Sequence, residues 1–158
     1  MWYNSVMKNK LIGFISILLL VAIDLWSKQT VTTAISHNQQ VEVIDHFFWL
    51  THVHNTGAAW SLFNGQVGIL TLVSFVAAIA LIVIYLRDQQ STIANVALVL
   101  MIAGTIGNLY DRFALNYVRD FLSFNLFGYM FPVFNVADSL LVIGVIILMV
   151  EVLINERD

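Results

Sequence analysis

Four apolar stretches, each near the roughly 20 residues that a helix needs to cross a lipid bilayer, limit what this 158-residue chain can fold into. The hydropathy pattern predicts helices at about residues 8–28, 67–86, 93–111 and 133–154. Apolar residues make up 59% of the chain and charged residues 11%, whereas a soluble domain averages about 45–50% and about 25%. We therefore expect a mainly α, polytopic membrane protein that forms a single membrane domain over residues 1–158, and we exclude a soluble enzyme.

The first apolar stretch has a second interpretation. Its centre, Leu11 to Ile23, follows Lys8 and Lys10, as the apolar core of a secretory signal peptide would. No small-x-small cleavage site follows, and Asp24 to Lys28 extends the segment to spanning length. We therefore favour a first transmembrane helix.

Four spans place both termini on one side of the membrane. The basic residues near the span ends hardly distinguish the two sides of the membrane. The side of the termini has four, Lys8, Lys10, Arg87 and Arg157, and the other side has three, Lys28, Arg112 and Arg119. The first helix usually dominates orientation, and two lysines precede it. We expect cytoplasmic termini.

The connection between the first two helices predicts a small extracytoplasmic β-sheet. Over about residues 38–62, short runs of β-branched and aromatic residues alternate with turn residues. Trp49, Trp60 and Phe63 suit the aromatic belt of a membrane interface, so we expect the sheet to lie on the membrane surface. The second outer connection, about residues 112–132, is also rich in aromatic residues, and we expect a loop that rests in the headgroup layer.

Several kinds of chemistry are excluded or disfavoured. The absence of cysteine excludes disulfides, thiolate nucleophiles and Cys-ligated zinc. Seven scattered basic residues and a net charge of -3 offer no stripe for nucleic acid. His52 and His54 form a His-x-His pair, but neither a His-Glu-x-x-His helix nor a Gly-x-Ser-x-Gly motif is present. We expect no metal and no cofactor.

Four of the ten acidic residues fall at the outer edge of the predicted bilayer, namely Asp24, Asp111, Asp120 and Asp138. An ionisable residue at membrane depth costs at least about 2.5–3.5 kcal/mol, so its presence suggests function. Three of them also have a structural interpretation: an ion pair of Asp111 with Arg112, an i,i+4 ion pair of Asp24 with Lys28, and a helix-start cap in which Asp138 follows Asn135 by three residues.

Asp120 and Asp138 together would suit peptide hydrolysis. Two carboxyl groups close together cannot readily both ionise, so one stays protonated and the other acts as a base. The base can activate a water for attack on a peptide carbonyl, while the acid protonates the developing oxyanion and then the leaving amine. This chemistry requires no metal.

Two further clusters have small residues at key positions. Gly104, Gly107 and Asn108 allow close helix contact, and Asn108 shares a helix face with Asp111 and Arg112. Asn55-Thr56-Gly57 is typical of an Asx turn that a backbone or a lipid could approach closely.

Four stretches, in order and spacing, resemble the bacterial lipoprotein signal peptidases (signal peptidase II). They are Asp24-Leu25-Trp26-Ser27-Lys28, Asn55-Thr56-Gly57-Ala58-Ala59-Trp60-Ser61, Gly104-Thr105-Ile106-Gly107-Asn108-Leu109-Tyr110-Asp111-Arg112 with Val118-Arg119-Asp120-Phe121, and Phe131-Pro132-Val133-Phe134-Asn135-Val136-Ala137-Asp138. The resemblance covers nearly the whole chain.

This resemblance implies an intramembrane aspartyl endopeptidase that cuts diacylglyceryl-modified prolipoproteins before the lipidated cysteine, near the outer leaflet. It implies Asp120 and Asp138 as the catalytic pair, and a surface sheet that cradles the substrate. Implied partners are lipoprotein signal peptides, membrane lipids and globomycin-type cyclic antibiotics, and we expect a monomer. The positions that shape or support the site would be Asp24, Lys28, Asn55, Gly57, Gly104, Asn108, Asp111, Arg112, Asn135 and Ala137.

The chain departs from the family pattern at Trp60, Ala103 and Arg119, where phenylalanine, glycine and an apolar residue are usual. Arg119 matters most, because a cation beside Asp120 should lower the pKa of that carboxyl. On this basis Asp120 would be the base and Asp138 the proton holder. The N-terminus of the last helix opposes this assignment, because it favours an ionised Asp138.

Two other function classes fit the composition. A small proton- or ion-coupled transporter subunit would also carry intramembrane carboxylates, but the middles of the second and fourth spans lack charged residues. A structural assembly partner would tolerate asparagine at both aspartates.

Overall fold

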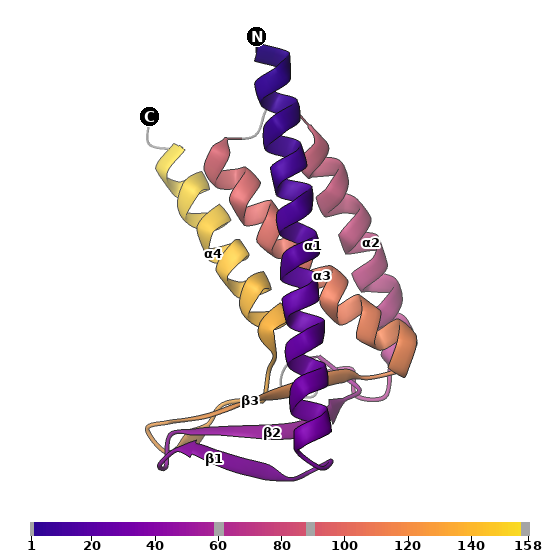
Figure 1. The fold of residues 1–158 in the computed structure, drawn as a ribbon, viewed down its shortest axis with the longest axis vertical. Helices are drawn as coiled ribbons and strands as arrows, with labels where there is room; N and C mark the ends of the chain where they lie inside the picture. Colours follow the sequence, from indigo (N-terminus) through magenta and orange to yellow (C-terminus); the bar gives the residue numbers. More distant parts are fainter. Residues whose placement is uncertain (1, 59–61, 88–90, 156–158) are drawn as a thin grey trace.

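The computed structural model describes residues 2–58, 62–87 and 91–155. Trp60 and Arg157, used above, lie outside these ranges. The described residues form four helices and four strands, which Figure 1 shows as a bundle with a sheet at one end. In chain order the elements are α1 (Trp2–Ala34), β1 (Gln40–Ile44), β2 (Phe48–Asn55), α2 (Val67–Leu86), α3 (Thr92–Leu115), β3 (Val118–Leu126), β4 (Tyr129–Met130) and α4 (Val136–Asn155).

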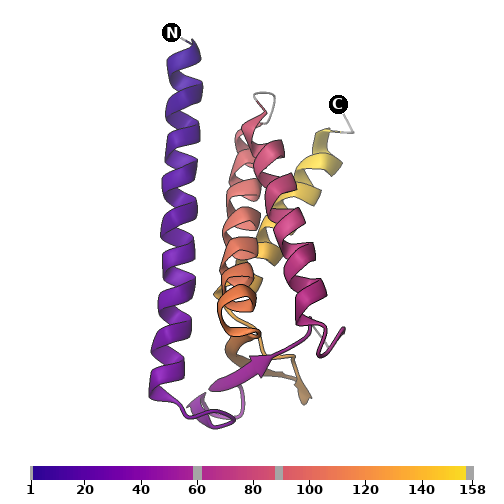
Figure 2. The same ribbon diagram turned by 90° about the vertical axis from the view of Figure 1, so that its right-hand side faces the viewer.

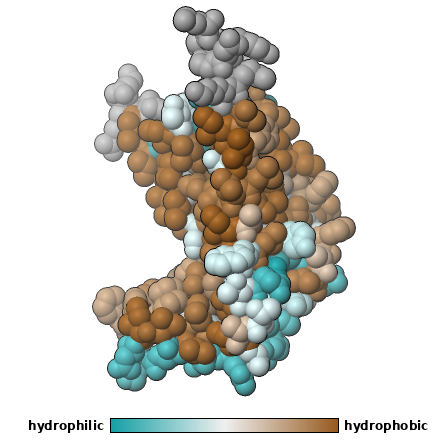
Figure 3. Space-filling model, viewed as in Figure 1, coloured by the Kyte–Doolittle hydropathy of each residue, from teal (hydrophilic) through white to brown (hydrophobic). Residues whose placement is uncertain are grey.

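The predicted combination of four spans and a small sheet is confirmed. All four helices are long and apolar enough to cross a membrane. Their outward surfaces carry many exposed leucine, isoleucine and valine side chains. Figure 3 shows this apolar surface continuing over the helices, while hydrophilic residues gather below the sheet. Such a surface is stable only in contact with lipid, so the chain is a multi-pass membrane protein.

Four helix ends differ from the prediction by three or more residues. α1 begins at Trp2 and continues beyond Lys28 to Ala34, because Val31 in the added turns packs against Phe121 of the sheet. α3 continues to Leu115. α4 begins at Val136 rather than near residue 133, since Pro132 and the Asn135 cap precede it.

α3 is the central helix of the bundle. Figure 2 shows α1 on one side of α3, with α2 and α4 on the other. Ile102 and Ala103 of α3 are almost fully buried. They belong to a core that also contains Ile17 of α1, Tyr85 of α2 and Leu140 of α4.

The predicted loop at about residues 112–132 was wrong, because most of it forms strands. The four strands make one antiparallel sheet in the order β1-β2-β3-β4. β3 pairs with β2, so the second outer connection completes the sheet begun by the first. The C-terminal end of α1 contacts this sheet. Val31 in the last turns of the helix and Ile35 just after it pack against Phe121 of β3.

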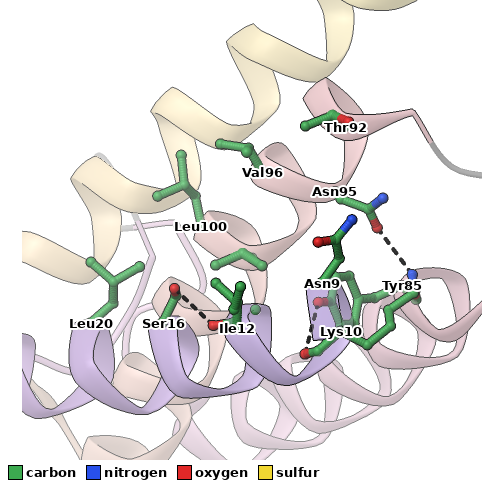
Figure 4. A pocket seen from close by; sticks show the side chains of 12 residues that line it. Asn9, Lys10, Ile12, Ser16, Leu20, Tyr85, Thr92, Asn95, Val96 and Leu100 are labelled. Atoms are coloured by element: carbon green, nitrogen blue, oxygen red, sulfur yellow. Dashed lines mark hydrogen bonds between the residues drawn. The ribbon is translucent and has the colours of Figure 1, made fainter. Parts of the chain in front are cut away.

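The far end of α1 is fastened to α2 and α3 beside a cavity of about 500 Å³. The Lys10 ammonium donates to the Tyr85 carbonyl and to Asn95 Oδ1, 3.1 Å away. Figure 4 shows Lys10, Tyr85 and Asn95 meeting at the polar end of this cavity, with Leu20 and Leu100 at its apolar end. Lys10 therefore ties three helices together at the end opposite the sheet.

At the other end of the helices, a buried ion network joins α1, α3 and α4 to the sheet. The Lys28 ammonium lies 2.7 Å from Asp24 Oδ2 and 3.5 Å from Asp111 Oδ2, and all three side chains are fully buried. Asp111 Oδ1 also lies 2.7 Å from Arg119 Nη2 of β3. Asp24 Oδ1 accepts from the Ala137 backbone N–H at 2.9 Å, so the network connects α1, α3, β3 and α4.

Removing the Lys28 charge should destabilise the protein strongly. Lys28→Met leaves two buried carboxylates with one cation fewer, and breaking a buried ion pair by removing one partner costs about 3–5 kcal/mol. The loss should be smaller in a double variant, Asp24→Asn with Lys28→Met. Reversible unfolding in detergent measures both, and equal losses would contradict the network.

Close packing of α4 on α3 gives a second stability prediction. A Cβ at Gly144 would lie 2.8 Å from the Ala97 carbonyl oxygen and 2.6 Å from Met101 Cγ. Gly144→Ala should therefore lower the free energy of unfolding by about 1–3 kcal/mol.

The matched control is Gly68→Ala in α2, where a Cβ would meet nothing within 4 Å. Alanine should there stabilise the helix by roughly 0.5–1 kcal/mol. Thermal unfolding of both variants in the same detergent checks the contrast, and an unchanged Gly144→Ala variant would show that the helices can separate freely.

Candidate active site

Asn135, immediately before α4, holds the carboxyl groups of both Asp120 and Asp138. Its side-chain Nδ2 donates to Asp120 Oδ1 at 2.7 Å, and its backbone N–H donates to Asp138 Oδ2 at 3.1 Å. Asn135 is itself completely buried, so its position is set by packing. One rigid residue thus brings together two carboxyl groups that come from β3 and from α4.

Asp138 has the helix-start geometry that the sequence predicts. The Asp138 backbone N–H donates to Asn135 Oδ1 at 2.9 Å, while Asp138 Oδ2 accepts from the Asn135 backbone, which is a reciprocal cap. Asn108 of α3 donates from Nδ2 to Asp138 Oδ1 at 2.7 Å. Two donors and a helix N-terminus all favour the ionised carboxylate.

Asp120 lies in a less favourable place for a charge. Its residue is only 2% exposed. Asn55 Nδ2 donates to Asp120 Oδ2 at 2.8 Å, opposite the bond from Asn135. Burial first, and then the neighbouring Asp138 carboxylate, raises the pKa of Asp120 to about 7. The two carboxyl groups therefore have different environments, which favours one proton shared unequally between them.

The predicted effect of Arg119 on Asp120 was wrong. Successive residues of a strand point to opposite faces, and the Arg119 guanidinium turns away from Asp120. It bonds Asp111 through Nε at 3.2 Å and Nη2 at 2.7 Å, and Gln29 Oε1 through Nη1 at 3.0 Å. The cation therefore stabilises the buried network and does not lower the pKa of Asp120.

The predicted ion pair of Asp111 with Arg112 was also wrong. Asp111 pairs with Lys28 and Arg119, because adjacent helix residues point in different directions. Arg112 instead donates to Ser74 Oγ at 3.3 Å and to the Gly57 carbonyl at 3.5 Å. The predicted i,i+4 pair of Asp24 with Lys28 is confirmed.

The predicted Asx turn is present. Asn55 Oδ1 accepts from the Gly57 backbone N–H at 2.9 Å, which leaves Asn55 Nδ2 pointing at Asp120. A Cβ at Gly57 would lie 2.7 Å from the Leu62 carbonyl oxygen, so only glycine allows the chain to fold back here. The turn therefore orients the amide that contacts Asp120.

Two glycines of α3 allow neighbouring elements to pack closely against this helix. A Cβ at Gly107 would lie 2.4 Å from Asp24 Oδ2, and one at Gly104 would lie 2.4 Å from the Ala137 carbonyl oxygen. The Asp24 carboxylate therefore reaches the buried network only because residue 107 has no side chain. Ala137, whose exposed fraction is 0%, fits against α3 for the same reason.

A cavity of about 740 Å³ opens onto the two carboxyl groups. Figure 3 shows the molecule hollowed on one side, between the helices and the apolar upper surface of the sheet. The walls are largely apolar, with Asp120, Asp138, Asn108 and Arg112 as polar groups. Further lining residues are Val73, Ala77, Phe131, Leu141, Val142 and Ile143.

The structure links the twelve residues proposed for the site in one connected set of contacts, but two further contacts were missed. Ser74 and Gln29 each bind one of the arginines. No sequence motif marks them, since each lies within an ordinary helix. The strand alternation of Val118-Arg119-Asp120 could have shown that Arg119 and Asp120 face opposite ways, and it was overlooked because the segment was predicted as a loop.

Comparisons with known proteins agree with the motifs. Residues 16–154 match the family model described as Signal peptidase (SPase) II. The chain is 36% identical to the lipoprotein signal peptidase of Staphylococcus haemolyticus over 151 residues, covering 93% of this chain and 96% of that protein. It is 39% identical to the lipoprotein signal peptidase of Enterococcus faecalis over 140 residues, covering 88% and 86%.

Two solved structures described as bacterial membrane enzymes have the same fold. One aligns with a TM-score of 0.85 at 34% identity, covering 91% of this chain and 88% of that chain. The other aligns with a TM-score of 0.81 at 35% identity, covering 89% and 92%. The resemblance drawn from the motifs is thereby confirmed, and this chain belongs to the signal peptidase II family of proteases.

Proposed function

We propose that this protein removes the signal peptide of diacylglyceryl-modified prolipoproteins, cutting before the lipidated cysteine, and that Asp120 and Asp138 are its catalytic pair. One observation carries the assignment: Asn135 bonds both carboxyl groups at the wall of the large cavity. Membership of the signal peptidase II family supports the reaction class.

The two environments support an assignment of the shared proton. Asp138, bonded by Asn108 and by the Asn135 backbone at a helix start, is the ionised base. Asp120, whose pKa burial raises to about 7, holds the proton. This reverses the assignment drawn from Arg119, because that cation faces Asp111.

Hydrolysis then proceeds with balanced proton transfers. Asp138 removes a proton from water as the water oxygen bonds to the peptide carbonyl carbon, and Asp120 donates its proton to the carbonyl oxygen. The resulting diol collapses as Asp138 passes its proton to the leaving amine and Asp120 recovers a proton from a diol hydroxyl. The C–N bond breaks, and both carboxyl groups return to their starting states.

The remaining polar residues position this pair. Asn55 and Gly57 orient a donor to Asp120, while Asn108 and Asn135 orient donors to Asp138. Arg112 faces the cavity beside the Gly57 carbonyl. The supporting framework comprises Asp24, Lys28, Gly104, Asp111 and Ala137.

The apolar cavity suits a lipid-anchored substrate. Its walls would bury acyl chains and the apolar part of a signal peptide, which would place the scissile bond beside the carboxyl groups. We infer that the site lies near the outer leaflet of a bacterial plasma membrane, with cytoplasmic termini, and that the sheet lies on the membrane surface. We also infer a monomer that contacts membrane lipids and is inhibited by cyclic peptides of the globomycin type.

The transporter alternative is not supported. The comparisons match proteases, and the Asp120 and Asp138 carboxyl groups lie together at one end of the helices. A conduction path would need polar groups through the full membrane depth.

Substitution of either aspartate should abolish cleavage. We expect Asp120→Asn and Asp138→Asn each to lower the rate by at least about 10²-fold, since each removes one proton-transfer step. The measurement is the gel shift of a diacylglyceryl-modified prolipoprotein incubated with purified protein in detergent, with and without a chelator. The unlipidated precursor should not be cut.

The control is Asp45→Asn, because Asp45 is an exposed residue of the β1–β2 turn that does not line the cavity. It should cleave as fast as the wild type. Retained cleavage in either folded dyad variant would show that the pair is misassigned, and chelator-sensitive cleavage would contradict the proposed chemistry.

The pH dependence should follow Asp120. Because Asp120 must be protonated and its pKa is about 7, the cleavage rate should fall as pH rises through about 7. Asn55→Ala removes a hydrogen bond that lowers this pKa, so the basic limb should move to higher pH. Arg119→Gln should leave the limb in place, since the guanidinium faces Asp111. An upward shift in Arg119→Gln would restore the assignment that the sequence suggested.

A further inference from the structure

Three histidines gather where α1 meets the sheet, on the side away from the active site. His37 lies between α1 and β1, and His52 and His54 lie two residues apart on β2. His54 is opposite Arg119 in the strand register, whereas Val53 is opposite Asp120. Because strand residues alternate between faces, the histidines and Asp120 occupy opposite faces of the sheet.

A backbone contact orients the His52 ring. His52 Nδ1 lies 2.9 Å from the Ile35 carbonyl oxygen. A carbonyl can only accept, so Nδ1 carries the hydrogen and the lone pair of the neutral ring is on Nε2. Metal-ligating histidines typically have this outer-shell bond, which sets the tautomer and the ring direction.

The two oriented nitrogens lie at ligand spacing. His52 Nε2 and His54 Nε2 are 3.1 Å apart. Two ligands of a tetrahedral zinc ion, each about 2.0–2.1 Å from the metal, are separated by roughly 3.3 Å. The contact therefore allows either an imidazole–imidazole hydrogen bond or a shared ion.

Two further rings pack near His54, and one of them is a third imidazole. The His54 ring stacks on Tyr117 at 3.7 Å, and the His37 ring lies 4.0 Å away on a tilted plane. His37 is exposed, so its side chain has room to turn.

We propose that His52, His54 and His37 form a site for a divalent transition-metal ion such as Zn²⁺, outside the catalytic centre. Imidazole nitrogens are ligands for zinc, copper and nickel. The nearby Arg119 guanidinium makes two hydrogen bonds to the Asp111 carboxylate. This ion pair reduces the repulsion between Arg119 and a bound metal ion. Since the site joins the α1–β1 connection to β2, binding should stabilise the native fold.

Another group of possible ligands serves as the internal comparison. Glu42, Asp45 and His46 have ligand atoms within 4.8 Å of one another in the β1–β2 turn, but all three are exposed. None has a buried partner that orients it among the contacts described, and exposed acidic groups commonly lie together without an ion.

The experiment is a Zn²⁺ titration of the full-length protein in detergent, by calorimetry and by the rise in thermal unfolding temperature. The wild type should bind one ion and unfold at a higher temperature. His54→Gln and His52→Gln should weaken binding by at least about tenfold, because even an outer-shell partner is worth 10–100-fold. Co²⁺ should give the absorption bands of a histidine-ligated ion in the wild type but not in these two variants.

His37→Gln serves where the β2 variants fail to fold, since an exposed side chain can be replaced without disturbing packing. It should also weaken binding, whereas His46→Gln should bind as the wild type does. The proposal is overturned if Zn²⁺ leaves the wild-type unfolding temperature unchanged, if folded His54→Gln and His37→Gln bind normally, or if His46→Gln abolishes binding. None of these readouts depends on peptidase activity.

Discussion

The arrangement of this protein depends on the ion pairs and the hydrogen bond of the buried Lys28 ammonium. It lies between Asp24 of α1 and Asp111 of α3, and it donates to Asn108 at 3.0 Å. A charge in this position is tolerated only because carboxylates and an amide surround it. The same carboxylates reach the α4 backbone and Arg119 of β3, so a single cluster sets the positions of three helices and one strand.

This cluster explains how the Asp120 and Asp138 carboxyl groups can lie close together although the cation of Arg119 is adjacent to Asp120 in the sequence. Arg119 and Asp120 are neighbours on β3, but the strand directs the cation into the structural network and the acid into the cavity. Arg112, in contrast, faces the cavity, where Ser74 and the Gly57 carbonyl accept its hydrogen bonds. Asp120 is contacted by neutral amides of Asn55 and Asn135, and a raised pKa follows from burial.

The site is asymmetric in a way that suits acid–base chemistry. Asp138 belongs to a helix N-terminal cap, where two donors and the helix dipole favour negative charge. Asp120 belongs to a buried strand without a helix terminus. Two residues of the same type therefore have different environments because of their secondary structure, and the proposed mechanism uses this difference.

The sequence by itself determined the four spans, the level at which the acidic residues meet, the Asp24–Lys28 pair and the Asn135–Asp138 cap. These features depend on hydropathy or on separations of three and four residues, which local geometry converts directly into contacts. Only the tertiary structure decided that residues 118–126 form a strand, that Asp111 pairs with Arg119, and that the three histidines converge. The physical reason is that pairing partners in a sheet and buried ion pairs come from distant segments, and one strand can direct adjacent charges to opposite faces.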